Sequence, residues 1–339
     1  MDRIAIIIPF YQRSAGILKR ALLSIAAQVE IEAYDVSVLI VDDASPVAPE
    51  NDIQAVAMPT NIKCHVLKKE NGGPASARNH GIVSADSADF IAFLDSDDEW
   101  NIRHLATAMR AFSHKPDCDF FFEDSLENDE VTLYQHYSLP IPTDTNIELC
   151  DNEIKCLPSR EALHYVSSQY ISHTSTIVFR KLPQNKSLFF PTDQKYTGED
   201  HLMWISLVSR SRYVCYTFNI GSRRGRGVDI FRGIVYSDKK RWLVRNAADV
   251  MRIDRILRGY DLNADTRAML RVERRRYGEE IIKSVIRKNI ISTLRDPEVI
   301  AILKQIYPYP WSDILILVMR IIRSKLRLTL FRRERSVYG

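Results

Sequence analysis

The chain has 339 residues, of which 45% are hydrophobic and 27% are charged, which is the composition of a globular protein with a sizeable core. These values exclude a disordered, collagen-like or disulfide-scaffold protein. The net charge of +4 hides an asymmetry, because residues 1–219 carry 19 Lys and Arg against 30 Asp and Glu, whereas residues 220–339 carry 28 against 13. An acidic first part is typical of metal binding, and a basic second part is typical of contact with phosphates, anionic lipid or nucleic acid.

The cysteines and the apolar segments predict a cytoplasmic protein that does not span a membrane. The five cysteines are an odd number without a C-x-x-C pair, which predicts a reduced chain. The apolar run at residues 4–8 ends at Pro9 and is too short for the apolar part of a signal peptide. No stretch approaches the roughly 20 apolar residues of a membrane-spanning helix, so we expect any membrane contact to be peripheral.

Four short apolar segments rich in β-branched residues predict buried parallel strands. They are residues 4–8, 36–41, 64–67 and 90–94. Apolar residues recur at helical spacing over 17–25 and 75–83, whereas 46–62 is irregular. Strands that alternate with crossover segments predict an open α/β sheet. Because ligands of such sheets bind beyond the carboxyl ends of the strands, polar residues after each strand are the candidates for a site.

Two of these strands end in acidic turns. Asp42 and Asp43 follow the second strand, and the sequence Asp-Ser-Asp-Asp-Glu-Trp follows the fourth at residues 95–100. A single acidic turn is most often a cap or an Asx-turn. Four carboxylates in one short turn repel one another unless a cation faces them, and oxygen ligands favour Mg²⁺ or Mn²⁺. The second turn is therefore a candidate metal site.

A glycine-rich segment, Asn-Gly-Gly-Pro at residues 71–74, lies between the acidic turns and predicts the start of a helix. The helix N-terminus is able to receive a phosphate, although a plain turn explains the same residues. Arg78, one turn later, is expected either to be solvated or to pair with the acidic turns. Neither G-x-G-x-x-G after the first strand nor G-x-x-x-x-G-K-[ST] occurs, which argues against dinucleotide-binding and P-loop sites.

Together, four motifs resemble glycosyltransferase family 2 in their order and spacing. They are Ile6-Ile7-Ile8-Pro9-Phe10-Tyr11, Val41-Asp42-Asp43-Ala44-Ser45, Asn71-Gly72-Gly73-Pro74 through Ala77-Arg78-Asn79, and Phe93-Leu94-Asp95-Ser96-Asp97-Asp98. The resemblance covers about residues 1–110, and segments 173–180 and 198–204, similar to an acceptor-side strand and an E-D motif, extend it to about 220. It implies a GT-A fold, which is a Rossmann-like open mixed sheet flanked by helices. It also implies a nucleotide-diphosphate sugar donor, a divalent metal ion (Mn²⁺ or Mg²⁺) and inversion at the anomeric carbon, with Arg78 among the donor-binding residues.

The resemblance implies particular roles on the donor side. Asp43 would contact the nucleotide base in a pocket lined by Pro9 and Tyr11. Asp95 and Asp97 would form the D-x-D element of the family. Asp95 would face the ribose and the sugar phosphate, and Asp97 would hold the metal ion, whose charge stabilises the departing nucleotide diphosphate.

On the acceptor side, Asp200 falls on the catalytic base of the family, which accepts the proton of the attacking hydroxyl. Glu199 is the second candidate for this role. The alternative is that both residues only begin a helix over 200–209, where acidic side chains favour the helix dipole. Trp204, one turn further on, would either stack against an acceptor sugar or belong to the core.

Two positions depart from the family pattern. Gln12 stands where the family more often has Asn. The candidate for the Q-x-x-R-W motif of processive polysaccharide synthases is Asp238-Lys239-Lys240-Arg241-Trp242, with Asp in place of Gln. Because membrane-spanning segments are lacking as well, we expect transfer of one sugar per encounter.

The basic second part of the chain predicts three features. The Gly- and Arg-rich loop 222–228 either closes over the diphosphate or is a solvated linker. Residues 235–305 predict helices whose arginines mostly face water. Residues 311–335 predict a basic amphipathic helix, which binds an anionic membrane surface or packs against the protein or a second subunit.

The expected organisation is a GT-A catalytic domain followed by two extensions. Its boundaries are 1–220 for the catalytic domain (1–110 for the nucleotide-sugar and 111–220 for the acceptor side), 221–310 for a basic helical extension, and 311–339 for the amphipathic helix. We predict a metal-dependent hexosyltransferase, peripheral on the inner face of the cell membrane, that transfers one sugar from a UDP-sugar, preferably UDP-glucose. The acceptor would be a lipid-linked oligosaccharide or another glycan in bacterial exopolysaccharide biosynthesis.

Two other functions fit the residues less well. A metal-dependent nucleotidyltransferase also uses carboxylate pairs on an α/β sheet, but it usually carries a Gly-rich basic loop after the first strand, where this chain has Pro9-Phe10-Tyr11. A nucleic-acid-binding protein would use the basic second part. The arginines there lack interleaved aromatic residues and form no known DNA or RNA motif, so we expect no nucleic-acid partner.

Overall fold

The computed structural model describes most of the first 287 residues. The described residues are 1–128, 131–137, 148–149, 153–181, 188–194, 197–225, 239–287 and 297. The chain divides into two compact units, Met1–Ile230 with Tyr260–Arg267, and Phe231–Gly259 with Ala268–Gly339. The predicted boundaries after residues 220 and 310 stay predictions, and the predicted amphipathic helix 311–335 lies outside the described residues.

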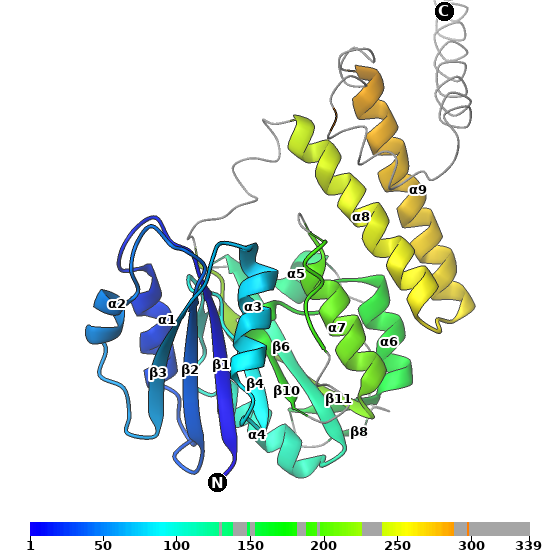
Figure 1. Cartoon of the computed structure of the whole chain (residues 1–339). Coiled ribbons are helices and arrows are strands. Elements are labelled where there is room, and N and C mark those ends of the chain that lie inside the picture. The colour runs from blue at the N-terminus through cyan, green and yellow to red at the C-terminus, as the bar shows by residue number, and fades with distance from the viewer. Residues whose placement is uncertain are drawn as a thin grey trace, which may run out of the picture. The chain divides into compact units, whose positions relative to one another are not determined.

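A mixed sheet of 11 strands forms the centre of the first unit, with helices packed against it (Figure 1). The path of the sheet is β3-β2-β1-β4-β10-β6-β11-β9-β8, with β5 paired to β11 and β7 paired to β6. The strands are β1 Arg3–Phe10, β2 Asp35–Asp42, β3 Ile62–Lys68, β4 Phe90–Phe93, β5 Glu99–Trp100, β6 Cys118–Asn128, β7 Val131–Thr132, β8 Glu148–Leu149, β9 Lys155–Pro158, β10 Ile177–Arg180 and β11 Tyr213–Arg223. β1 to β4 are parallel, whereas β10 runs antiparallel to β4 and β6. The predicted open mixed α/β sheet is confirmed.

Helices lie between these strands along the chain and after β11. They are α1 Ile17–Ala26, α2 Glu50–Gln54, α3 Gly73–Ser84, α4 His104–His114, α5 Leu133–Tyr137, α6 Ser159–Ser168, α7 Glu199–Arg210, α8 Lys239–Gly259 and α9 Ala264–Arg287, with the short 3₁₀ turn η1 Thr174–Thr176. The helices expected over 17–25, 75–83 and 200–209 correspond to α1, α3 and α7. The segment 46–62, expected to be irregular, contains the short helix α2.

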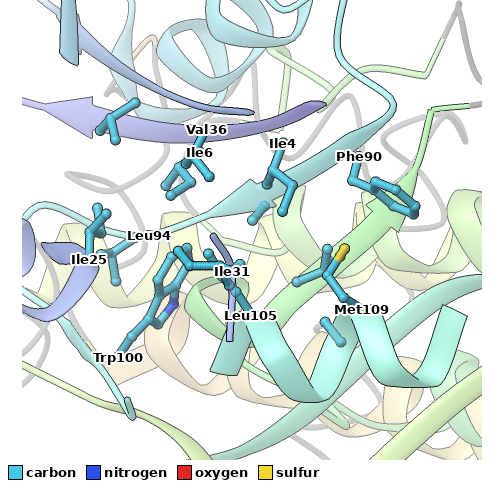
Figure 2. Packing of buried hydrophobic residues seen from close by; sticks show 14 of the residues in the cluster. Ile4, Ile6, Ile25, Ile31, Val36, Phe90, Leu94, Trp100, Leu105 and Met109 are labelled. Carbon is cyan, nitrogen blue, oxygen red and sulfur yellow. The ribbon is translucent and has the colours of Figure 1, made fainter. Parts of the chain in front are cut away.

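The apolar run of β1 is continuous because the strand is buried on both faces. Ile4, Ile6 and Ile8 join the core cluster that includes Leu22 of α1 and Leu105 of α4. Figure 2 shows side chains of β1, β4, α1 and α4 gathered in this cluster. The intervening Ile7 faces Gly81 of α3. Burial on two faces is the reason why the sequence lacks the polar alternation of a half-exposed strand.

The second unit contains α8 and most of α9, which confirms the helices predicted within 235–305. Arg274 donates to Asp254 at 2.9 Å, and this ion pair joins the two helices. Arg252 is only 3% exposed and pairs with Asp249 one turn earlier on α8. Arg252 is therefore an exception to the expectation that most arginines of this region face water.

The structure bears on two expectations, that the chain does not span a membrane and that its cysteines are reduced. No helix within the described ranges is both long and apolar enough to cross a lipid bilayer. Cys64 and Cys118 are free thiols, and the sulfur of Cys215 lies 2.7 Å from that of Cys156, but Cys156 is disulfide-bonded. The expectation of a fully reduced chain is therefore wrong at Cys156.

Candidate active site

The parallel strands β1, β2 and β4 end at the same edge of the sheet. Gln12, in the loop after β1, forms hydrogen bonds to the loops after β2 and β4. The side-chain amide of Gln12 donates to the hydroxyl of Ser96 at 2.8 Å. Its backbone N–H donates to the hydroxyl of Ser45 at 2.9 Å. Gln12 is 3% exposed, so the residue that departs from the family pattern has a structural role here. Pro9 and Tyr11, predicted to line the base pocket, lie at this edge and are partly exposed.

Asp43 follows β2, and its carboxylate lies at the N-terminus of α3. Its carboxylate accepts the backbone N–H groups of Gly72 at 2.9 Å and Gly73 at 2.7 Å, and the ammonium of Lys69 lies 2.5 Å away. Gly73 has φ of 83°, a left-handed conformation that glycine adopts without strain. The N–H groups considered as phosphate donors thus bind a carboxylate of the same chain. The contact of Asp43 with a nucleotide base stays a prediction.

Arg78 connects the acidic turn after β4 to the start of α7. One terminal nitrogen lies 2.6 Å from Asp95 and the other lies 3.8 Å from Glu199. The guanidinium also lies over the ring of Phe190, 5.3 Å from its centroid. Burial by itself would lower the pKa of Arg78, but the charges of Asp95 and Glu199 raise it overall. Arg78 is therefore a fixed cation paired with the acidic turn, and it is not solvated.

Asp95, Asp98 and His173 form the candidate metal group. Each offers one ligand atom, and the three atoms lie within 4.8 Å of one another. Burial on its own would raise the pKa of Asp95, but Arg78 and His173 outweigh this effect and lower it. Burial, followed by the charge of Asp95, raises the pKa of Asp98 to about 7. Burial lowers the pKa of His173, which favours the neutral imidazole that binds metals.

The donor set of this group fits a divalent cation. Two carboxylates and one imidazole are suitable ligands for Mn²⁺, and Mg²⁺ also binds to carboxylates. Asp95 is half-buried and Asp98 is buried, and two carboxylates this close repel each other unless a positive charge is shared between them. The residues present therefore fit Mn²⁺ or Mg²⁺.

Asp97, the predicted metal ligand, does not belong to this group. Its backbone carbonyl accepts a hydrogen bond from Arg20 at 3.4 Å, and its side chain is partly exposed. Gly225 lies against the same carbonyl, so that a Cβ atom at Gly225 would come within 1.6 Å of the carbonyl oxygen. The segment after β11 thus lies against the acidic turn, and Gly225 donates its N–H to Asp98 at 2.8 Å. Metal binding by Asp97 stays a prediction.

Glu199 and Asp200 form the first turn of α7, as expected. Burial, followed by the charge of Asp200, raises the pKa of Glu199 to about 7. Burial also raises the pKa of Asp200, whose carboxylate accepts the backbone N–H of His201 at 2.7 Å. Raised pKa values in neighbouring carboxyl groups are typical of acid–base sites, although ion-pair networks also produce them.

Trp204 lies in the core and not on a surface that a sugar reaches. Its side chain is 1% exposed and packs edge-on against Tyr170 and His201, with ring centroids 5.8 and 6.1 Å away. Of the two alternatives for Trp204, the geometry favours the core residue. Stacking of this indole on an acceptor would require the helix to open.

A model of Glycosyl transferase family 2 matches residues 5–174, about half of the chain. The chain belongs to glycosyltransferase family 2. It is 31% identical over 239 residues to the Succinoglycan biosynthesis protein ExoW of Rhizobium meliloti (strain 1021), which covers 69% of this chain and 72% of that protein.

Two solved structures share this fold at low identity. S. aureus TarS 1–349 in complex with UDP-GlcNAc is 18% identical, with a TM-score of 0.57 over 90% of this chain and 80% of that chain. The mannosyltransferase PcManGT from Pyrobaculum calidifontis in complex with GDP-Man and Mn²⁺ is 14% identical, with a TM-score of 0.56 over 89% and 79%. Both likenesses bear on the fold alone, and they agree with the GT-A arrangement of the sheet.

Among the predicted family 2 site residues, the structure brings Arg78, Asp95 and Glu199 together. Asp98 and His173 complete the candidate metal group, although neither was singled out as a predicted site residue. The signal for Asp98 was present in the acidic turn itself. His173 had only its place in the acceptor-side motif, because nothing in the sequence shows that this segment folds back against the turn.

Proposed function

We propose that this family 2 enzyme transfers a single sugar from a UDP-sugar to a glycan acceptor, with inversion at the anomeric carbon. The observation that carries the proposal is the placement of the acidic turn beside Arg78, which reaches the start of α7. Donor-side and acceptor-side carboxylates thus lie around one buried cation. The likeness to a succinoglycan biosynthesis protein supports exopolysaccharide assembly as the pathway. UDP-glucose is the preferred donor of this proposal, and a lipid-linked oligosaccharide is the preferred acceptor.

The candidate metal group is the proposed cation site. Asp95, Asp98 and His173 would hold Mn²⁺ or Mg²⁺, and Asp97 is the alternative ligand from the family motif. When bound, the cation would neutralise the charge that develops on the departing nucleotide diphosphate. The pairing of Arg78 with Asp95 keeps that carboxylate ionised, so that it can act as a ligand at neutral pH.

Arg224 is the proposed second positive charge at the diphosphate. It donates to Glu127 at 2.7 Å, and it lies close enough to Asp95 and Asp98 to interact electrostatically with both. Because Arg224 lies near the carboxylates of the acidic turn, it is suited to bind phosphate oxygens there. Residues 226–228 of the predicted basic loop lie outside the described residues.

Asp200 is the proposed general base, with Glu199 as the alternative. As the acceptor oxygen forms its bond to the anomeric carbon, its proton passes to the carboxylate, and the bond between that carbon and the UDP oxygen breaks. Burial raises the pKa of Asp200 and so makes it a stronger base. Among the described residues Glu199 is paired with Arg78, whereas no ion pair includes Asp200, and this difference supports Asp200.

Binding of the donor tests the proposal directly. The chain is incubated with UDP, UDP-sugars or GDP-sugars, each with Mn²⁺ or with EDTA, and thermal unfolding is followed. We expect UDP and one UDP-sugar to raise the melting temperature only when Mn²⁺ is present, with UDP-glucose giving the largest shift. Release of UDP on addition of a lipid-linked glycan would then establish transfer. Equal protection by GDP-sugars, or retention on heparin without any effect of UDP, would count against the proposal.

A further inference from the structure

Ser175 contacts all three residues of the candidate metal group. Its hydroxyl oxygen accepts the backbone N–H of Asp95 at 3.0 Å and donates its proton to Oδ2 of Asp98 at 2.6 Å. Its backbone N–H donates to Nδ1 of His173 at 3.4 Å. A hydroxyl has one proton and two lone pairs, so both side-chain contacts are satisfied at once.

The position of Ser175 is set by the core of the protein. The residue is fully buried in η1, and the indole N–H of Trp100 donates to its carbonyl at 2.5 Å. Trp100 is 5% exposed and belongs to the core cluster shown in Figure 2. The backbone N–H of Trp100 in turn donates to Ser24 of α1. The hydroxyl of Ser175 therefore projects from a rigid support, as a group that orients ligands must.

We propose that Ser175 is a positioning residue, which holds Asp95 and Asp98 at the spacing that a divalent cation requires. The inference rests on the proposed function, because it assumes that these residues bind the cation. Without the hydroxyl, a buried carboxylate oxygen and a buried backbone N–H each lose a partner, and the turn would move to recover one. Groups that orient metal ligands in this way typically change metal affinity about 10- to 100-fold when they are removed.

Two substitutions at position 175 separate orientation from packing. Ser175→Cys keeps nearly the same volume but replaces the hydroxyl by a thiol, which is a weak donor and acceptor. Ser175→Thr keeps the hydroxyl but adds a methyl group to a site without free space, which lowers stability. Ser172→Ala is the matched control, since Ser172 is a buried serine next to η1 that bonds Thr176 and the carbonyl of His173.

The readouts are Mn²⁺ binding, by the electron paramagnetic resonance signal of free Mn²⁺, and UDP binding in its presence by calorimetry. We expect Ser175→Cys to weaken Mn²⁺ binding about 10- to 100-fold. Ser175→Thr should bind Mn²⁺ nearly as tightly as the wild type, although it melts at a lower temperature, and Ser172→Ala should bind it normally.

Three outcomes would overturn the inference. Unchanged Mn²⁺ affinity in Ser175→Cys, with binding by the wild type intact, overturns the role of Ser175 alone. An equal loss in Ser172→Ala means that any weakening of this segment has the same effect. If the wild-type chain binds no Mn²⁺ with or without UDP, the proposed metal site fails and the inference fails with it.

Discussion

The guanidinium of Arg78 donates to the carboxylate of Asp95 across 2.6 Å, and this pair joins α3 to the turn after β4. The side chain of Arg78 is 7% exposed and that of Asp95 is 24% exposed. Because the arginine is buried and also lies 3.8 Å from Glu199, its positive charge compensates the negative charges of both Asp95 and Glu199. Its removal would leave negative charges without compensation in a poorly solvated place.

Arg78→Met should therefore lower the free energy of unfolding by about 3 kcal/mol, the lower end of the range for breaking a buried pair. Urea denaturation measures this loss. Arg103→Met is the matched control, because Arg103 pairs with Glu30 while both side chains are more than half exposed. Such surface pairs contribute less than about 1 kcal/mol. Similar losses in the two variants would show that Arg78 has no special role in holding the acidic turn.

The fold was predictable where local pattern and burial coincide. The four apolar segments correspond to β1 to β4. β1, β2 and β4 contain few polar residues because they are buried on both faces, whereas β3 lies at the edge of the sheet and is partly exposed. The order of strands beyond β4 was not predictable. β10 pairs antiparallel to β4 although 83 residues separate Phe93 and Ile177, and no local signal carries information over that distance.

The site was predictable only in part for the same reason. The acidic turn 95–98 stood out in the sequence, but the choice of Asp97 came from the family motif. The structure groups Asp98 with Asp95 instead, because β10 brings His173 against the turn. The role of Trp204 was also not predictable, because its position in the helix fitted either a core or a surface residue. Tertiary packing places it in the core.

Asp97→Asn and Asp98→Asn distinguish the two metal assignments. If the candidate metal group is the cation site, Asp98→Asn should weaken Mn²⁺-dependent UDP binding much more than Asp97→Asn. Of these two residues, Asp98 is the one grouped with Asp95 and His173. Asp95→Asn should abolish it, and EDTA should abolish turnover in the wild type. Calorimetric titration with UDP in Mn²⁺ measures the affinities. A larger loss of UDP affinity in Asp97→Asn than in Asp98→Asn would instead assign the metal ion to Asp97.

Asp200→Asn should lower transfer by about 10² to 10⁴, the range typical of general-base catalysis, while Mn²⁺-dependent UDP binding stays nearly unchanged. The amide keeps the shape of the side chain but does not accept the proton. Glu199→Gln serves as the comparison, since it lies in the same helical turn. Full activity of Asp200→Asn with loss of activity in Glu199→Gln would assign the base to Glu199, and loss of UDP affinity would point to a donor-side role.

Glu199 should make stability depend on pH. Burial raises its pKa to about 7, so the folded chain keeps this proton at pH values at which an unfolded Glu, with a pKa of about 4.3, has released it. Stability from this group is therefore present below about pH 4 and decreases as pH rises toward 7. Glu199→Gln does not ionise, so it should melt at a higher temperature than the wild type at pH 8 but not at pH 4.5.

The measurement is a series of melting temperatures in EDTA, which keeps metal ions from altering the charge near Arg78 and Asp200. Glu161→Gln is the control, because Glu161 also lies in the first turn of a helix but is exposed. That variant should follow the wild type at every pH. A Glu199→Gln chain that follows the wild type from pH 4.5 to 8 would mean that Glu199 is ionised in the folded state.

Residues 311–335 should bind the chain to anionic membranes. The longest uninterrupted apolar run in this segment is Ile314–Met319, which ends at Arg320. This apolar run is too short to cross a bilayer, so the segment would lie in the membrane surface. Each Lys or Arg near an anionic leaflet adds about 1 kcal/mol to binding. Binding should thus be strong on phosphatidylglycerol vesicles, weak on phosphatidylcholine vesicles, and reduced by salt, since screening limits the reach of the charges to about 8 Å at physiological ionic strength.

Removal of 311–339 should abolish co-sedimentation with anionic vesicles and spare transfer to a soluble acceptor analogue. If the apolar side of this segment instead packs against the protein or a second copy, its removal would expose apolar surface, lower the melting temperature or separate a dimer. The truncated chain therefore distinguishes the two alternatives through vesicle binding, thermal unfolding and mass in solution. A truncated chain that still binds anionic vesicles would place the membrane contact elsewhere, and the basic helices α8 and α9 would be the next segments to test.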